Sequence, residues 1–394
     1  MKFNADTFTL TDAGKFGNRA LLIGAFGILL SALGYFLDAE RFFYSYLTSF
    51  VFWVTIGLGG LFFVMLHHLT SAKWSVVLRR ITENFMVSVP ILAIFFLPLI
   101  LGLHDLFHWT HESAIADDAI LQQKAPYLNT AFFLLRAALY FIIWTILGRM
   151  LYKASLKQDA EASESVTARM KKISAPGMLL FALTLTLASF DWLMSLDAHW
   201  YSTIFGVYVF SGSLLAILAV LTLMTIYLQN NGALTETITV EHYHDLGKLM
   251  FAFTIFWAYI AFSQFMLIWY GNIPEETIFY KHRWEEMSWR IVSLMVLFGH
   301  FVVPFLALVT RAAKRNLKML KAASIWILLM HWVDMYWLVL PNFGHELHFS
   351  WMDVTTLIGI GGIFLWYVWK AMTAHPLIPV KDPKLQASID FVNQ

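Results

Sequence analysis

Carboxylates and a guanidinium lie inside stretches of this sequence that are otherwise apolar. Asp191 and Asp334 each fall within a long apolar run, and Arg136 falls within another. An ionisable side chain in lipid is costly, so each is a candidate for a proton or ion pathway and needs a partner. Asp191 and Arg136 are predicted at similar depth, and we expect them to form a buried ion pair. That pair either ties two helices together or belongs to a proton relay.

Histidines accompany the second carboxylate. His331 precedes Asp334 by one helical turn on the same helix face. A carboxyl group beside an imidazole in a low dielectric can exchange protons near neutral pH, which predicts a proton-handling pair. His300 and His331 are also predicted near mid-membrane on successive helices. They could therefore bind one haem between them, or they could be ordinary core histidines.

One apolar run carries several polar side chains at depth. Tyr259 and Ser263 are four residues apart, and Gln264 and Thr254 lie in the same run. Hydroxyl and amide groups at this density suit either a hydrated channel or hydrogen bonds between helices. Our candidates for a proton pathway are therefore Asp191, Asp334, His331, Arg136, His300, Tyr259, Ser263 and Gln264.

Three histidines follow a helical repeat at the end of the third apolar run. His104, His108 and His111 are spaced i, i+4 and i+7, which would place all three on one helix face. Such a face could bind a metal ion. A surface cluster at a subunit interface is the alternative that we favour, and we expect no metal site.

The composition is that of a membrane protein. Of the 394 residues, 59% are hydrophobic and 13% are charged, about half the usual charged fraction of a soluble domain. The net charge of +1 argues against nucleic acid as a partner. Because the sequence has no cysteine, this chain cannot hold an iron–sulfur cluster through cysteine, attach a c-type haem or form a disulfide.

The apolar runs predict an all-α polytopic membrane protein with ten transmembrane helices. We expect two four-helix bundles, helices 2–5 and 6–9, flanked by helices 1 and 10, within a single membrane domain that contains a repeat (44–200 and 203–342). The predicted helices cover residues 19–37, 44–66, 84–103, 128–150, 176–196, 203–228, 247–270, 289–310, 322–340 and 353–372.

Lysine and arginine are concentrated in alternate loops, such as 149–172 and 311–321. Positive charge favours the cytoplasmic side, so we predict that both chain ends are cytoplasmic. The charged segment 157–172 is predicted to extend as helix beyond the membrane.

Two long stretches resemble the polysulfide-reductase-type membrane subunits, the NrfD/PsrC family. They are FAFTIFWAYIAFSQFMLIWYGNIPEE (251–276) and SFDWLMSLDAHWYSTIFGVYVFSG (189–212). Within that family the sequence is most similar to the membrane subunits of bacterial alternative complex III, a quinol:electron-carrier oxidoreductase, and its length and short tails are more like the ActF type than the ActC type.

The resemblance implies a subunit of a respiratory complex in the bacterial inner membrane. It implies no redox cofactor in this chain, with haem c and iron–sulfur clusters in partner subunits and quinol bound nearby. The implied partners are a paralogous quinol-binding membrane subunit, an iron–sulfur subunit and a multi-haem cytochrome c subunit, with a terminal oxidase as a further candidate. The implied role is scaffold together with proton-conducting residues.

Two other functions are compatible with the residues alone. A secondary transporter would also have ten helices and a repeat, and Pro90, Pro98 and Pro304 would then mark broken helices. A haem b or quinone-binding anchor would use His300 and His331.

Overall fold

A computed structural model describes residues 1–344 and 346–393. In this part of the chain, ten helical spans are long and apolar enough to cross a membrane, as predicted. The spans are α1 (Phe16–Leu37), α2 (Ala39–Thr70), α3 (Val76–Val87) with α4 (Val89–Leu101), α8 (Thr130–Ala160), α9 (Glu164–Trp192) with the short helix η2 (Met194–Leu196), α10 (Phe205–Asn230), α11 (Val240–Gly271), α13 (Met287–Met295) with the π-helical η3 (Val296–Val302) and α14 (Val303–Leu308), α16 (Leu317–Val339) with η4 (Leu340–Asn342), and α17 (Trp351–Ala374).

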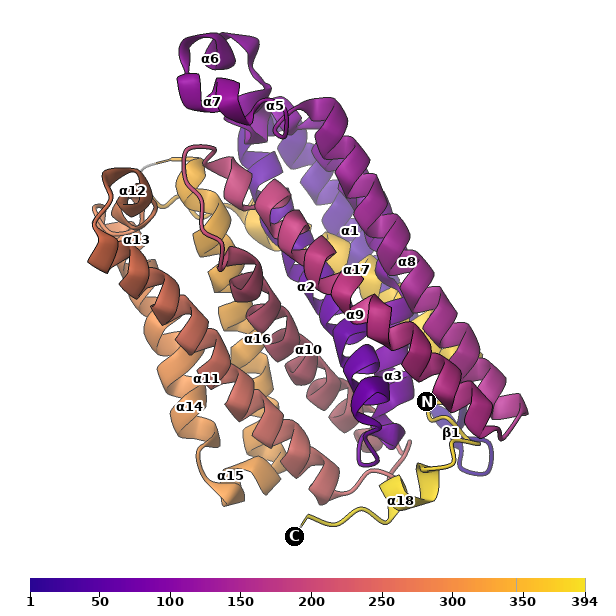
Figure 1. Cartoon of the computed structure of the whole chain (residues 1–394). Helices are drawn as coiled ribbons and strands as arrows, with labels where there is room; N and C mark the ends of the chain where they lie inside the picture. The colour runs from indigo at the N-terminus through magenta and orange to yellow at the C-terminus, as the bar shows by residue number, and fades with distance from the viewer. Residues whose placement is uncertain (345, 394) are drawn as a thin grey trace.

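The remaining elements are short. They are the hairpin of β1 (Lys2–Asn4) and β2 (Thr9–Asp12), then α5 (Leu103–Leu106), η1 (His108–Thr110), α6 (Glu112–Asp117), α7 (Ala119–Lys124), α12 (Pro274–His282), α15 (Arg311–Arg315) and α18 (Leu385–Ile389). Helices α5 to α7 lie at one end of the bundle, whereas both chain ends lie at the other (Figure 1). We call these the α7 end and the terminal end.

The predicted division into two four-helix bundles is confirmed. In the first bundle, each of α2, α3–α4, α8 and α9 contacts the next, and α9 contacts α2 again. In the second bundle, α10, α11, the α13–α14 span and α16 are arranged in the same way. Helices α2 and α10 are the most deeply buried spans and pack against each other. Each also contacts the last helix of the other bundle, so the two halves repeat the same order of contacts. A repeat in the sequence itself stays a prediction.

The first and last spans pack closely against each other outside the bundles. A Cβ atom on Gly362 would lie 2.5 Å from the Cα of Gly24, and one on Gly27 would lie 2.6 Å from the backbone nitrogen of Gly359. Only glycine permits this approach, which is a common way to join helices in lipid, where the hydrophobic effect does not drive helices together.

Several helices are longer than their apolar runs. Helix α8 continues to Ala160 and α9 begins at Glu164, so the charged segment 157–172 is helical as predicted except at residues 161–163, where the chain passes from one helix to the other. The C-terminal tail then crosses the terminal end of the molecule. Ser388 accepts a hydrogen bond from His242 of α11 and donates one to the carbonyl of Trp74, so this tail connects the two halves.

Candidate functional site

Asp334 lies at the centre of the second bundle, with no solvent exposure. The hydroxyl of Tyr208, on α10, donates a hydrogen bond to Oδ1 of Asp334. The indole Nε1 of Trp257, on α11, donates to Oδ2 over 3.2 Å. The imidazole Nδ1 of His300, on η3, lies 3.8 Å from Oδ2, which is beyond hydrogen-bond distance. All four spans of the bundle therefore meet at this carboxyl group, and we call these four residues the Asp334 site.

The electrostatics of this site follow from the partners of the carboxyl group. A phenol, an indole and an imidazole surround it, and no lysine or arginine lies within ion-pair distance in the described residues. A buried carboxylate is stable only when it is paired or hydrogen-bonded, and here the hydrogen bonds come from neutral groups. The carboxyl group is therefore able to gain and lose a proton.

The structure gives His331 a different partner from the one predicted. Its Nε2 forms a 2.9 Å hydrogen bond with Oγ1 of Thr55 on α2, and its Nδ1 has no hydrogen-bond partner in the described residues. The expected pairing of His331 with Asp334 is wrong, because the ring is turned toward the other bundle. His300 is the imidazole that approaches Asp334.

His300 lies in a π-helical segment. Pro304 has no N–H, so it cannot close the usual α-helical bond to the carbonyl four residues earlier, which is that of His300. The segment Val296–Val302 forms π-helix just before this proline. Insertions of this kind often occur at functional sites, because they reorient a side chain without ending the helix.

The two histidines do not offer a slot for haem. Their ring centroids are 6.2 Å apart and both side chains are fully buried. The ring of Trp257 packs on His300 with centroids 4.1 Å apart, and a Cβ on Gly212 would lie 3.0 Å from the ring of His331. A macrocycle between the histidines would require these packed groups to move.

The predicted ion pair between Arg136 and Asp191 is present in the first bundle. Nε and Nη2 of Arg136 donate to the two oxygens of Asp191, each over 2.8 Å. Tyr140 donates a third hydrogen bond, over 2.7 Å. A bidentate guanidinium fixes the position of a carboxylate through two parallel hydrogen bonds, so this arrangement favours the tie between α8 and α9 over a proton relay.

The two acids have corresponding places in the two bundles. Asp191 is on α9 and Asp334 is on α16, each the fourth span of its bundle, and each approaches a basic group on the third span. The basic group is a guanidinium in the first bundle and an imidazole in the second. The chemistry of the two sites differs accordingly, since a guanidinium always carries its positive charge whereas an imidazole can be neutral.

The polar residues of α11 do not form one channel face. Tyr259 is 63% exposed on the outside of the bundle, so its place in an internal pathway is wrong. Ser263 is half-buried. Gln264 is buried and connects α11 with its neighbours, accepting a 2.9 Å hydrogen bond from Ser202 and donating one to the hydroxyl of Tyr280. Thr254 bonds to its own helix backbone.

The predicted single helix face of His104, His108 and His111 is also wrong. Helix α5 ends at Leu106 and Phe107 is extended, so the repeat is broken between the first two histidines. His111 Nε2 bonds instead to the carbonyl oxygen of His104, over 2.8 Å. No metal-binding group of three or more histidines and carboxylates occurs in the part of the chain that the structure describes.

Sequence reasoning missed a charged network at the terminal end. Glu83 lies between two arginines of its own helix, 3.0 Å from Arg79 and 2.9 Å from Arg80, and all three are buried. Arg79 also pairs with Asp382 of the tail, and Arg80 with Asp159 of α8. The spacings of three and four residues between Glu83 and these arginines are those of helical ion pairs, and they are the signal that could have revealed this network.

Arg283 is a second residue that the sequence did not single out. It is buried near the α7 end, where it donates to the backbone carbonyls of Trp337 and Leu338 over 3.0 and 2.9 Å. Burial lowers the pKa of Arg283 to about 9. It pairs with no carboxylate in the described residues, and it instead completes the C-terminal end of α16.

The prolines are not arranged as broken transporter helices would be. Pro98 lies inside α4, and Pro90 follows the bend between α3 and α4 in the second span of its bundle. Pro304 follows η3 in the third span of the other bundle. Broken helices in transporters usually occupy corresponding positions in the two halves, which these prolines do not.

Fold and site together define an all-α, multi-pass membrane protein. The second bundle holds the buried carboxyl group of Asp334 without a lysine or arginine partner in the described part of the chain, whereas Asp191 in the first bundle is held by Arg136. Comparisons with models of known protein families and with curated proteins find no match for this chain.

Proposed function

We propose that this chain is a membrane subunit of a bacterial respiratory complex that oxidises quinol, of the polysulfide-reductase type and most similar to ActF of alternative complex III. Its task would be to hold the complex in the inner membrane and to carry protons at the Asp334 site. The resemblance of residues 189–212 and 251–276 supports the family. The two bundles of four helices with flanking first and last helices agree with the expected fold.

One observation carries the proton role. Asp334 is buried among Tyr208, Trp257 and His300 without a fixed positive charge, whereas Asp191 is fixed by Arg136. A proton carrier must be stable in both protonation states, and hydrogen-bond donors with a nearby imidazole stabilise the ionised form without making it permanent.

Redox centres would belong to the partners in this proposal. The chain lacks cysteine, and its two central histidines are tightly packed, so electrons would pass through haem c and iron–sulfur subunits bound at one face. The paralogous membrane subunit would bind quinol. Both chain ends would be cytoplasmic, in agreement with their common position at one end of the bundle (Figure 1).

Purification of the tagged chain in a mild detergent tests the proposal. We expect co-purifying multi-haem c and iron–sulfur subunits, and a visible spectrum with c-type haem and no b-type haem from this chain. A lone, colourless protein would contradict the proposal and favour a transporter. A b-type spectrum from the isolated chain would favour the haem anchor.

A further inference from the structure

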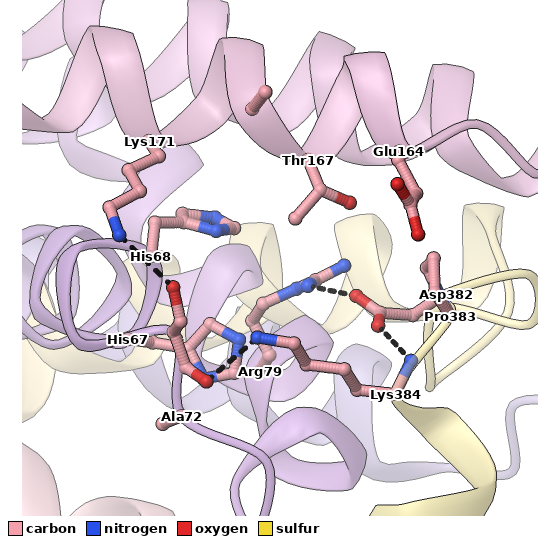
Figure 2. Close-up of a pocket in the computed structure, with 12 residues that line it drawn as sticks. His67, His68, Ala72, Arg79, Glu164, Thr167, Lys171, Asp382, Pro383 and Lys384 are labelled. Atoms are coloured by element: carbon pink, nitrogen blue, oxygen red, sulfur yellow. Dashed lines mark hydrogen bonds and ion pairs between the residues drawn. The ribbon is translucent and has the colours of Figure 1, made fainter.

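A cavity of about 260 Å³ lies at the terminal end, and none of its lining residues belongs to the Asp334 site. The end of α2, the start of α9 and the C-terminal tail enclose it, with Arg79 of α3 at its inner side (Figure 2). Three segments distant in sequence thus build one pocket, and nothing in the proposed function uses it.

Two lysines from different segments converge on one residue of this cavity. Nζ of Lys171, on α9, lies 3.3 Å from the hydroxyl oxygen of Ser71, and Nζ of Lys384, in the tail, donates to the carbonyl of Ser71 over 2.8 Å (Figure 2). Neither lysine has a carboxylate within ion-pair distance in the described residues. Like charges gathered in this way repel each other unless an anion lies between them.

A buried imidazole adds a third group to the cavity. His68 lines it and is only 4% exposed, yet its Nε2 has no hydrogen-bond partner in the described residues. An unpaired buried polar atom costs free energy that a bound ligand would recover. The neighbouring His67 is already bonded through Nδ1 to Ser75 over 2.7 Å.

The buried carboxylate of the cavity already has hydrogen-bond partners other than the two lysine ammonium groups. Asp382 accepts from Arg79 over 2.6 Å and from the backbone N–H of Lys384 over 2.8 Å. Arg79 in turn is occupied by Asp382, Glu83 and Gln158. Glu164 alone is an exposed carboxylate on the rim without a described ion-pair partner.

We propose that this cavity binds a phosphate group, held by the ammonium groups of Lys171 and Lys384 and by Nε2 of His68. Lysine binds phosphate as a point charge, and a basic pocket where membrane helices end suits a phospholipid headgroup. A free phosphate has the same chemistry. The site does not depend on the proposed function, since it uses none of the residues of the Asp334 site.

The test compares matched variants of the full chain, purified with any subunits that accompany it. The double variant Lys171→Gln with Lys384→Gln removes both charges. The control, Lys318→Gln with Lys370→Gln, removes two charges outside the cavity, on α16 and α17. The variant Lys171→Arg with Lys384→Arg keeps the charge and shows whether lost binding reflects charge or misfolding.

Two measurements separate the sources of phosphate. Mass spectrometry of phospholipid retained after extensive detergent exchange detects a headgroup, and thermal unfolding in inorganic phosphate against chloride at equal ionic strength detects the free ion. Retained phosphatidylglycerol or cardiolipin that only the glutamine variant loses assigns a lipid. If phosphate raises the Tm of the wild type and the control but not that of the glutamine variant, the ligand is the free ion. We expect the glutamine variant to bind phosphate at least tenfold more weakly.

The opposite results overturn the proposal. Wild-type protein that neither retains lipid nor responds to phosphate has no such site, and equal behaviour of the glutamine and control variants excludes the two lysines. If the glutamine variant does not fold, the variant Glu164→Gln tests whether the cavity binds an anion. Removal of this rim carboxylate should tighten phosphate or lipid binding about threefold, since exposed charges contribute less than 1 kcal/mol. An unchanged affinity would count against the site.

Discussion

The carboxyl group of Asp334 and the imidazole of His300 face each other with 3.8 Å between Oδ2 and Nδ1. No hydrogen bond joins them, although both side chains are fully buried. A small movement of either side chain, or one water molecule, would connect them. The two groups are therefore placed to exchange a proton without being locked together, in contrast to the bidentate pair of Asp191 and Arg136.

We predict that Asp334→Asn lowers coupled proton movement about tenfold or more, while the complex still assembles. The amide oxygen of asparagine can still accept the hydrogen bond from Trp257, and its NH2 group can donate to the hydroxyl oxygen of Tyr208, so the fold should lose about 1 kcal/mol or less. Proton uptake by the reconstituted complex, followed with a pH-sensitive dye during quinol oxidation, measures the effect. Asp334→Glu, which keeps the carboxyl group, is the control. Unchanged coupling with normal assembly would rule out the proton role.

The sequence predicts how deep in the membrane each residue of these two sites lies, but not which way its side chain faces. The ion pair of Arg136 and Asp191 was predictable, because both side chains lie at one level of adjacent helices and few other partners were available. The partner of Asp334 was not, because depth does not give the rotation of a helix about its axis. The π-helical segment also shifts His300 relative to an α-helix, and its only sequence signal is Pro304.

The cavity at the terminal end lay beyond prediction for a different reason. The ten spans follow from apolar length, which is a local property of the chain. Lys171 and Lys384 come together only because the C-terminal tail folds back across the ends of the helices. Tertiary contacts of an irregular tail have no periodic pattern in the sequence, so the meeting of these two lysines could not be predicted from it.

Asp191→Asn should destabilise the protein by about 3 kcal/mol or more, because it leaves the guanidinium of Arg136 buried without its counter-ion. The midpoint of thermal unfolding in detergent measures the loss. The double variant Asp191→Asn with Arg136→Gln should be more stable than the single variant, since no unpaired charge remains. A single variant as stable as the wild type would show that the pair contributes little to the fold.

Gly362→Val should separate α1 from α17. The new side chain would meet the Cα of Gly24, and we expect a loss of about 1–3 kcal/mol, as for other overpacked sites. Because the chain has no cysteine, a single Ala20→Cys label site next to this contact reports the separation as faster maleimide reaction. Gly271→Val is the matched control, since a Cβ there meets nothing within 4 Å. Equal labelling of the two valine variants would contradict the predicted role of the contact.

At the α7 end, the loop that contains α6 and α7 should loosen in acid. Asp118 caps α7 and lies 2.5 Å from Nε2 of His199, and the hydrogen bond from His199, followed by that from the backbone N–H of Leu121, lowers the pKa of Asp118 below its ordinary value of 3.8. A carboxyl group with a lowered folded-state pKa stabilises the fold above its unfolded value, and this contribution is lost as the pH falls through the folded value. Pepsin digestion between pH 5 and 2.5 should therefore cut residues 112–124 faster below about pH 4.

The control for this prediction is Asp118→Asn, because asparagine remains a good helix cap but carries no charge. In this variant, the rate of cutting should change with pH only as the activity of pepsin itself does. If the wild type and this variant have the same pH profile, the ion contact with His199 does not hold the loop.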